Sequence, residues 1–215
     1  VELPEGFLKN VYKIIRNEGA LCISDEIQTG LGRVGDKFWG FELYDIIPDI
    51  VTIGKSFGNG HPISAVVCKK EIAEKFNNGM EFFSSFGGNP VSCAIANEVL
   101  NEVKNKKLQK NSKKIGDYII SEISKLTTKF PIISNIRGKG LFIGFELTNK
   151  DLQPLPLQTK YLVNRIKDFK ILLSSDGADK NVVKIKPPVI FNKQNVDYLI
   201  KSLNIVLKED FMKYY

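Results

Sequence analysis

Two apolar segments each lead into a side chain that can do chemistry. Residues 20–24 (Ala-Leu-Cys-Ile-Ser) precede Asp25, and residues 48–54 (Pro-Asp-Ile-Val-Thr-Ile-Gly) precede Lys55. Short apolar runs bounded by turn residues are typical of buried strands. In α/β sheets, ligands gather at the carboxyl ends of the strands. An acid and an amine at neighbouring strand ends therefore predict a ligand held between them.

The pair Asp25 and Lys55 suits one kind of ligand well. A lysine at the end of a buried strand can act as a Schiff-base nucleophile, because an apolar setting disfavours its charged form. Lys55 alone is weak evidence in a chain with 31 Lys and Arg residues. A pyridoxal cofactor, however, needs a lysine at its aldehyde and a carboxylate that keeps its ring nitrogen protonated. Lys55 and Asp25 meet these two requirements.

Other kinds of site fit the sequence less well. The segment Gly54-Lys55-Ser56 ends like a phosphate-binding loop, but that pattern demands a glycine five positions before Gly54, where Asp49 stands. A single histidine, three widely spaced cysteines and the lack of a Gly-x-Ser-x-Gly segment disfavour a zinc site and a His-based triad. We expect no metal ion and no nucleoside triphosphate.

Composition indicates a globular protein in a reducing compartment. The chain is 43% hydrophobic and 26% charged, and no apolar stretch approaches the roughly 20 residues that span a bilayer. The cysteines, Cys22, Cys68 and Cys93, form no disulfide or zinc pattern, which favours a cytoplasmic setting, or the mitochondrial matrix in a eukaryote. We expect no membrane partner. The chain starts at Val1 without an initiator Met and soon enters a helix and a core strand, so we expect a piece of a longer protein.

The net charge of +7 is unevenly distributed along the chain. Residues 1–100 carry a net charge of −4 and residues 101–215 a net charge of +11. A basic half can indicate nucleic-acid binding. Here the lysines are scattered along helical faces with little aromatic interleaving, which favours a solvated surface and no nucleic-acid partner.

Apolar periodicity predicts an alternation of helices and strands. The predicted helices cover residues 4–18, 69–76, 90–104, 108–125, 159–168 and 194–207. The predicted strands cover residues 20–24, 48–54, 63–68, 132–136, 141–147, 171–173 and 182–185. In the helix at 90–104 we expect the apolar residues to be buried, Val91 and Ala94 among them. Helix, strand, loop and strand in this order are typical of an α/β layer with a parallel sheet.

Four ordered segments resemble one enzyme family. They are residues 24–35 (SDEIQTGLGRVG), 48–62 (PDIVTIGKSFGNGHP), 86–90 (FGGNP) and 137–141 (RGKGL). Together they closely resemble the class III aminotransferases, which depend on pyridoxal 5'-phosphate. The resemblance implies the fold of the PLP-dependent transferases, fold type I, as in aspartate aminotransferase.

The resemblance also implies domains and an assembly. Residues 1–105 correspond to the C-terminal half of a PLP-binding large domain, residues 106–130 to a connecting helix, and residues 131–215 to a small C-terminal α+β domain. Members of the family are about twice as long as this chain. The resemblance further implies a homodimer with a shared active site.

Roles for individual residues follow from the same resemblance. Lys55 would form the Schiff base and carry the proton between substrate and cofactor, and Asp25 would pair with the pyridinium nitrogen. Gln28 would lie near the phenolic oxygen of the ring. Ser85 stands where the family usually has threonine, whose hydroxyl reaches the phosphate of the neighbouring subunit's cofactor. Two further residues leave alternatives open, since Glu26 and Arg33 could form a local ion pair or contact substrate.

One substitution concerns the substrate. Members that act on amino acids commonly place an arginine before the Pro-Pro of the last strand, where it binds the substrate carboxylate as a bidentate fork. In this chain Lys184 stands there, and a point charge suits a phosphate or a less demanding anion. Residues 172–177 and 181–188 resemble the branch of the alanine–glyoxylate aminotransferase 2-like proteins and the ethanolamine-phosphate phospho-lyases.

Three functions remain open at this point. The first is amino-group transfer from a primary amine or amino acid to a keto acid. The second is a phospho-lyase reaction on a phosphorylated amine such as phosphoethanolamine, favoured by Lys184. The third is a truncated, non-catalytic piece that folds without using Lys55.

Overall fold

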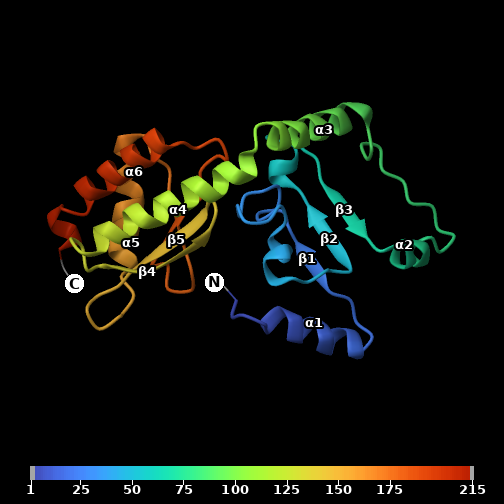
Figure 1. The fold of residues 1–215 in the computed structure, drawn as a ribbon, viewed down its shortest axis with the longest axis horizontal. Coiled ribbons are helices and arrows are strands. Elements are labelled where there is room, and N and C mark those ends of the chain that lie inside the picture. Colours follow the sequence, from blue (N-terminus) through green and yellow to red (C-terminus); the bar gives the residue numbers. More distant parts are fainter. Residues whose placement is uncertain (1–2, 214–215) are drawn as a thin grey trace. The chain divides into compact units, whose positions relative to one another are not determined.

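The computed structural model describes residues 3–213, which form two compact units (Figure 1). The first unit is residues 1–109 and the second is residues 110–215, so the boundary falls inside helix α4 (Leu108–Thr127). Within the described part of the chain, no helix is long and apolar enough to cross a membrane. The elements of the first unit are α1 (Phe7–Asn17), β1 (Ile23–Asp25), η1 (Gly40–Tyr44), β2 (Ile50–Ile53), η2 (Lys55–Phe57), β3 (Ala65–Cys68), α2 (Lys70–Phe76) and α3 (Pro90–Asn105).

The first unit is built on a three-stranded sheet in the order β1-β2-β3. Strands β1 and β2 are parallel, with Asp25 opposite Thr52, whereas β2 and β3 are antiparallel, with Ile53 opposite Ala65. The expected parallel pairing is therefore present, but the sheet is mixed. Its second connection, residues 54–64, contains the short η2 and no crossover helix, and a parallel return needs a longer connection.

Strand β1 is less buried than the sequence predicts. Cys22 is buried, whereas Ile23 is 61% exposed and Leu21 is exposed on the same side of the run. Successive side chains point to opposite faces of a strand, so one face of β1 packs inward. The expectation of burial on both sides is wrong for this strand, because no described residue covers its other face.

Helix α3 begins where the sequence predicts but buries a different set of side chains. Pro90 occupies the first turn, and the Asn89 side chain accepts a hydrogen bond from the Ser92 amide as the N-cap. The buried residues are Ser92, Ala96 and Val103. The expected burial of Val91 and Ala94 is wrong, because this face of α3 has no cover among the described residues.

A buried carboxylate anchors the start of β2. The Asp49 side chain accepts a hydrogen bond from the Cys22 amide at 2.8 Å and forms ion pairs with Arg16 at 3.0 Å and Lys69 at 2.5 Å. Burial alone would raise the pKa of Asp49, but Lys69, the Cys22 amide and Arg16 outweigh it and hold that pKa well below its ordinary value. The network ties α1 to the strands that present Asp25 and Lys55.

The second unit is a four-stranded antiparallel sheet with helices packed on it (Figure 1). The sheet order is β4-β5-β7-β6. Besides α4, its elements are β4 (Ile133–Lys139), β5 (Phe142–Leu147), α5 (Pro156–Arg165), η3 (Ile166–Phe169), β6 (Ser174–Asp176), β7 (Val182–Ile185), α6 (Lys193–Val206) and η4 (Asp210–Met212).

Two strands of this sheet differ from their predicted ranges. Strand β4 continues to Lys139, where the sequence suggests a loop from Arg137 onward. Strand β6 lies at residues 174–176, just after the predicted run 171–173. Pairing with β7 selects this polar segment, because Asp176 lies opposite Val182 across a hairpin that turns at Gly177, whose φ is 85°.

The core of the second unit is one continuous cluster of buried apolar side chains. It is contributed by α4, α5, α6 and the inward faces of β5 and β7, with Ile119, Phe145 and Leu203 completely buried. Burial alternates strictly along β5, as expected for a sheet with one covered face. A Cβ on Gly116 would lie 2.1 Å from the carbonyl oxygen of Gly140, so a glycine lets α4 approach the β4–β5 turn.

Candidate active site

Asp25 and Lys55 lie at the carboxyl ends of the two parallel strands of the first unit. Asp25 is the last residue of β1 and Lys55 the first of η2, two residues after β2 ends. The Glu26 amide continues the ladder by donating to the Thr52 carbonyl at 2.9 Å. Both side chains are exposed. The sheet thus brings an acid and an amine to the same edge.

Each of the two side chains keeps a reactive atom free of other partners among the described residues. Asp25 Oδ1 accepts a hydrogen bond from the Ile27 amide at 3.0 Å, which orients the carboxylate and leaves Oδ2 available. The Lys55 amine has no hydrogen bond or ion pair within residues 3–213. Lys55 also has a φ of 45°, in the left-handed region that non-glycine residues seldom adopt. Such strain is concentrated at functional sites.

Glu26 organises the loop that follows β1. It is 2% exposed and accepts hydrogen bonds from the Gly40 amide at 2.7 Å, the Phe41 amide at 2.8 Å and the Thr29 hydroxyl at 2.8 Å. These contacts hold the start of η1 against the turn that contains the half-buried Gln28. Of the two roles left open for Glu26, the local structural one fits, with backbone amides as the partners.

Ser85 lies in an exposed segment of the same unit. Residues 77–88 are all exposed, and the backbone turns there through a hydrogen bond from the Gly87 amide to the Ser84 hydroxyl at 3.1 Å. Among the described residues, no hydrogen bond joins Ser85 to Asp25, Gln28 or Lys55. The structure therefore does not bring Ser85 together with the other candidates.

Lys184 belongs to the second unit. It lies on β7, forms an ion pair with Asp176, and its amine is 5.7 Å from the centre of the Phe142 ring. The hydrogen bond from Lys184, with help from the Gly177 amide, lowers the pKa of Asp176. Lys184 therefore already has an anionic partner within its own sheet. Its role toward a substrate stays a prediction.

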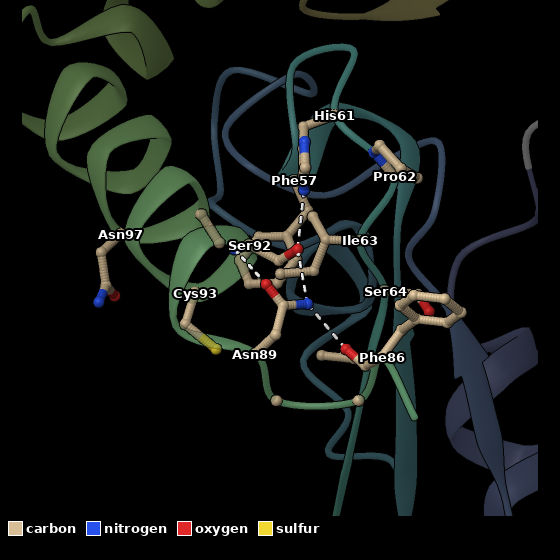
Figure 2. Close-up of a pocket in the computed structure, with 14 residues that line it drawn as sticks. Phe57, His61, Pro62, Ile63, Ser64, Phe86, Asn89, Ser92, Cys93 and Asn97 are labelled. Carbon is tan, nitrogen blue, oxygen red and sulfur yellow. Dashed lines mark hydrogen bonds between the residues drawn. The ribbon is translucent and has the colours of Figure 1, made fainter. Parts of the chain in front are cut away.

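One hollow of the first unit contains a polar cluster that sequence reasoning missed (Figure 2). The hollow measures about 1080 Å³ and lies between the loop after Lys55 and the start of α3. His61 Nε2 lies 2.7 Å from Ser92 Oγ, and Asn89 contacts Ser92 in turn. The sequence offered a lone histidine, and 31 residues separate it from Ser92. No periodic pattern connects residues at that distance.

Comparison with known proteins decides the family. A family model described as aminotransferase class-III matches residues 1–207. The chain belongs to the class III aminotransferase family. Enzymes of this family depend on pyridoxal phosphate. The resemblance inferred from four short segments is confirmed over almost the whole chain.

Relatives of two kinds match at similar levels. An alanine–glyoxylate aminotransferase 2-like protein of Drosophila melanogaster is 44% identical over 214 residues, which are 96% of this chain and 43% of the fly protein. The ethanolamine-phosphate phospho-lyase homolog 1 of Caenorhabditis elegans is 41% identical over 211 residues, covering 95% of this chain and 45% of the worm protein. The chain thus spans less than half the length of these class III relatives.

A solved structure of the family confirms the expected fold. A phospholyase from Arthrobacter, in complex with phosphoethanolamine, matches with a TM-score of 0.93 at 35% identity. The match covers 96% of this chain and 50% of the Arthrobacter chain. The fold is therefore that of the PLP-dependent transferases.

The residues at the sheet edge suit the cofactor of this family. Pyridoxal phosphate needs an oriented carboxylate at its ring nitrogen and a lysine free to react at its aldehyde. Asp25 has an oriented carboxylate with one unoccupied oxygen, and the Lys55 amine has no competing acid within the described residues. The donor set therefore fits the group.

Proposed function

We propose that the protein uses pyridoxal phosphate, held between Asp25 and Lys55, to transfer an amino group from a primary amine or amino acid to a keto acid. One observation carries the proposal. The parallel pairing of β1 and β2, with Asp25 opposite Thr52, puts an acid and an amine at one edge of the sheet. Membership of the class III family supports the same cofactor.

The two residues have distinct tasks in this reaction. When bound, pyridoxal phosphate supplies an aldehyde that captures amines and a ring that draws electrons from the carbon next to the captured amine. Asp25 holds the proton on the ring nitrogen, because its carboxylate is oriented by the Ile27 amide. Lys55 moves the proton at the substrate carbon, a task for an amine without an ion-pair partner.

Two further residues complete the proposed cofactor site. We assign Gln28, half-buried in the turn after β1, to the phenolic oxygen of the ring. We assign the Ser85 hydroxyl to the cofactor phosphate of a second copy of the chain, in a homodimer with shared sites. The exposed aromatic residues around Ser85 support this assembly, since exposed apolar patches mark interaction surfaces.

We also propose that the protein works in the cytoplasm. Cys22, Cys68 and Cys93 are free thiols. Free thiols are typical of a reducing compartment.

A second candidate function is a phospho-lyase reaction on a phosphorylated amine. Lys184 replaces the arginine that commonly binds a substrate carboxylate, and an ammonium suits a phosphate as a point charge. The Arthrobacter structure is of a phospholyase in complex with phosphoethanolamine. Both reactions begin by removing a proton from the carbon next to the amine. They differ in whether a phosphate then leaves or the amino group passes to a keto acid.

A product assay separates the two functions. The full-length protein encoded by the gene is incubated with phosphoethanolamine and, separately, with alanine plus glyoxylate. We expect glycine and pyruvate from the second mixture. Phosphate released from phosphoethanolamine without any keto acid would instead establish the phospho-lyase and reject the transaminase.

A variant pair tests whether Lys55 is used at all. Lys55→Ala should abolish both the absorbance of the bound cofactor and the activity. The matched control Lys37→Ala removes another exposed lysine of the first unit and should change neither. If wild type binds no pyridoxal phosphate and Lys55→Ala changes nothing, the chain is the non-catalytic piece.

A further inference from the structure

His61 connects the loop that follows Lys55 to helix α3. Its Nε2 lies 2.7 Å from Ser92 Oγ, in the first turn of the helix (Figure 2). Ser92 is 8% exposed and His61 is half-buried, so the contact is sheltered from water on the Ser92 side. A sheltered polar contact is worth more than an exposed one, because water cannot replace the lost partner.

The backbone of His61 is fixed relative to Lys55. The His61 amide donates to the Gly58 carbonyl at 2.9 Å, and the Gly58 amide donates to the Lys55 carbonyl at 3.3 Å. A Cβ on Gly58 would lie 2.0 Å from the His61 carbonyl oxygen. The turn therefore closes tightly on itself and leaves the His61 ring in a set position beside α3.

Hydrogen bonds continue from Ser92 to the segment that carries Ser85 (Figure 2). Asn89 Oδ1 accepts from the Ser92 amide at 2.9 Å, while Asn89 Nδ2 donates to Ser92 Oγ at 3.0 Å. The same Nδ2 donates to the carbonyl of Phe86 at 2.7 Å. Phe86 directly follows Ser85, whose own side chain has no hydrogen bond within residues 3–213. The place of the Ser85 hydroxyl therefore depends on how its backbone is held.

We propose that His61 is a positioning residue that holds the Ser85 hydroxyl in place for the cofactor phosphate. It acts through Ser92 and Asn89, and we call these three residues the relay. The inference rests on the proposed function, because it takes Ser85 as a phosphate ligand. The relay links the turn of the reactive lysine to the segment that binds the phosphate of the second copy's cofactor. One histidine therefore sets the spacing between residues that serve two neighbouring sites.

Two cofactor forms test this role in the protein as its gene encodes it. Pyridoxal phosphate carries the phosphate that Ser85 would bind, whereas pyridoxal lacks the phosphate and keeps the groups assigned to Lys55, Asp25 and Gln28. Titrations followed by cofactor absorbance give an affinity for each. We expect His61→Ala to weaken pyridoxal phosphate binding about tenfold, the loss of one sheltered hydrogen bond, and to leave pyridoxal binding unchanged.

Further variants show whether the effect passes through Ser85. Ser85→Ala should weaken pyridoxal phosphate binding alone, and His61→Ala added to it should cause no further loss, since residues that act through one another are not additive. Ser92→Ala should behave like His61→Ala. His61→Gln, whose amide can still reach Ser92, should recover most of the affinity. Asn97 lines the same hollow but does not belong to the relay, so Asn97→Ala is the matched control.

The outcomes distinguish this inference from the proposed function. Equal losses for both cofactor forms in His61→Ala and Ser92→Ala, or additive losses with Ser85→Ala, would overturn the relay and leave the proposed function standing. If His61→Ala fails to fold, His61→Gln and Ser92→Ala decide by the same comparison. The proposed function, and the relay with it, would be overturned by either of two results. One is that wild type binds neither cofactor form, and the other is that Lys55→Ala binds pyridoxal as well as wild type does.

Discussion

The two units of this chain differ in how completely they bury their own apolar residues. Among residues 3–213, the second unit has twenty-one buried hydrophobic residues in one cluster, and the first unit has seven. Large exposed hydrophobic residues show the reverse, with fourteen in the first unit and seven in the second. The second unit therefore buries most of its apolar residues within its own core, whereas the first leaves apolar surface exposed, a property typical of interaction surfaces. The candidate active site belongs to the less self-sufficient unit.

The largest expected effect lies in the core of the second unit. Phe145→Ala removes a completely buried ring at the centre of β5 and should lower the free energy of unfolding by about 3–5 kcal/mol. Chemical denaturation followed by circular dichroism measures the change. Leu172→Ala removes an 83% exposed side chain of the same unit and should stay within about 0.5 kcal/mol. Similar losses in both variants would contradict the picture of a self-contained core.

The first unit should instead depend on its buried ion network. Asp49→Asn weakens the contacts to Arg16 and Lys69 and should lower the free energy of unfolding by about 1–3 kcal/mol at neutral pH. The matched control is Asp45→Asn, which alters an exposed pair with Lys9 and keeps a residue that tolerates the left-handed backbone there. A larger loss in the control would show that the network is not the anchor.

The same network makes the stability of the first unit sensitive to acid. The folded pKa of Asp49 lies below its ordinary value, so the unfolded chain takes up the proton first as pH falls. The stabilisation is full above the unfolded pKa of about 3.9 and is lost as pH drops toward the folded pKa. Unfolding midpoints measured at neutral and acidic pH should converge between wild type and Asp49→Asn. Parallel curves would refute this.

A helix cap in the second unit should have a moderate effect. At the start of α6, the Asn192 side chain accepts a hydrogen bond from the Asn195 amide at 3.0 Å. The Asn195 side chain in turn accepts a hydrogen bond from the Asn192 amide. Asn192→Ala should therefore lower the free energy of unfolding by about 1 kcal/mol, and Asn192→Ser should restore most of it. Thermal melts of the three proteins provide the measurement.

The smallest effect on folding is expected where the first unit is most exposed. Phe83→Ser changes a ring that is 78% exposed and should alter the free energy of unfolding by less than about 0.5 kcal/mol. Self-association, measured by analytical ultracentrifugation, should nevertheless weaken, because the ring belongs to the apolar surface left open. If the variant associates as strongly as wild type, the segment around Phe83 takes no part in self-association.

Much of the fold could be predicted because its signals are local. Pro90 fixes the start of α3, and the apolar spacing of Ile115, Ile119 and Ile123 predicts α4. The sequence does not indicate strand β6, because residues 174–176 are polar and form a strand only through pairing with β7. The apolar run around Ile23 predicts more burial than the structure has, because such a run does not reveal which other segments lie over it.

In the candidate site too, residues with local sequence signals could be predicted, and contacts between distant segments could not. Asp25 and Lys55 could be predicted because each follows a strand and stands in a recognisable motif, and their roles stay predictions until they are tested. The contact of His61 with Ser92 could not be predicted, because it joins a loop to the first turn of α3 without any periodic relation in the sequence. The partners of Glu26 were not anticipated either, since backbone amides, such as those of Gly40 and Phe41, leave no mark in a sequence.

The short parallel pairing of β1 with β2 has a consequence for how the site assembles. Its three registered pairs, from Ile23–Ile50 to Asp25–Thr52, close a loop at a cost in chain entropy, and local opening of such a short ladder separates the two strand ends. The acid and the amine are therefore held at one edge only while this ladder is closed. A ligand that contacts both Asp25 and Lys55 binds only the form in which the ladder is closed, and therefore stabilises that form. Amide exchange in β1 should slow as the ligand concentration rises.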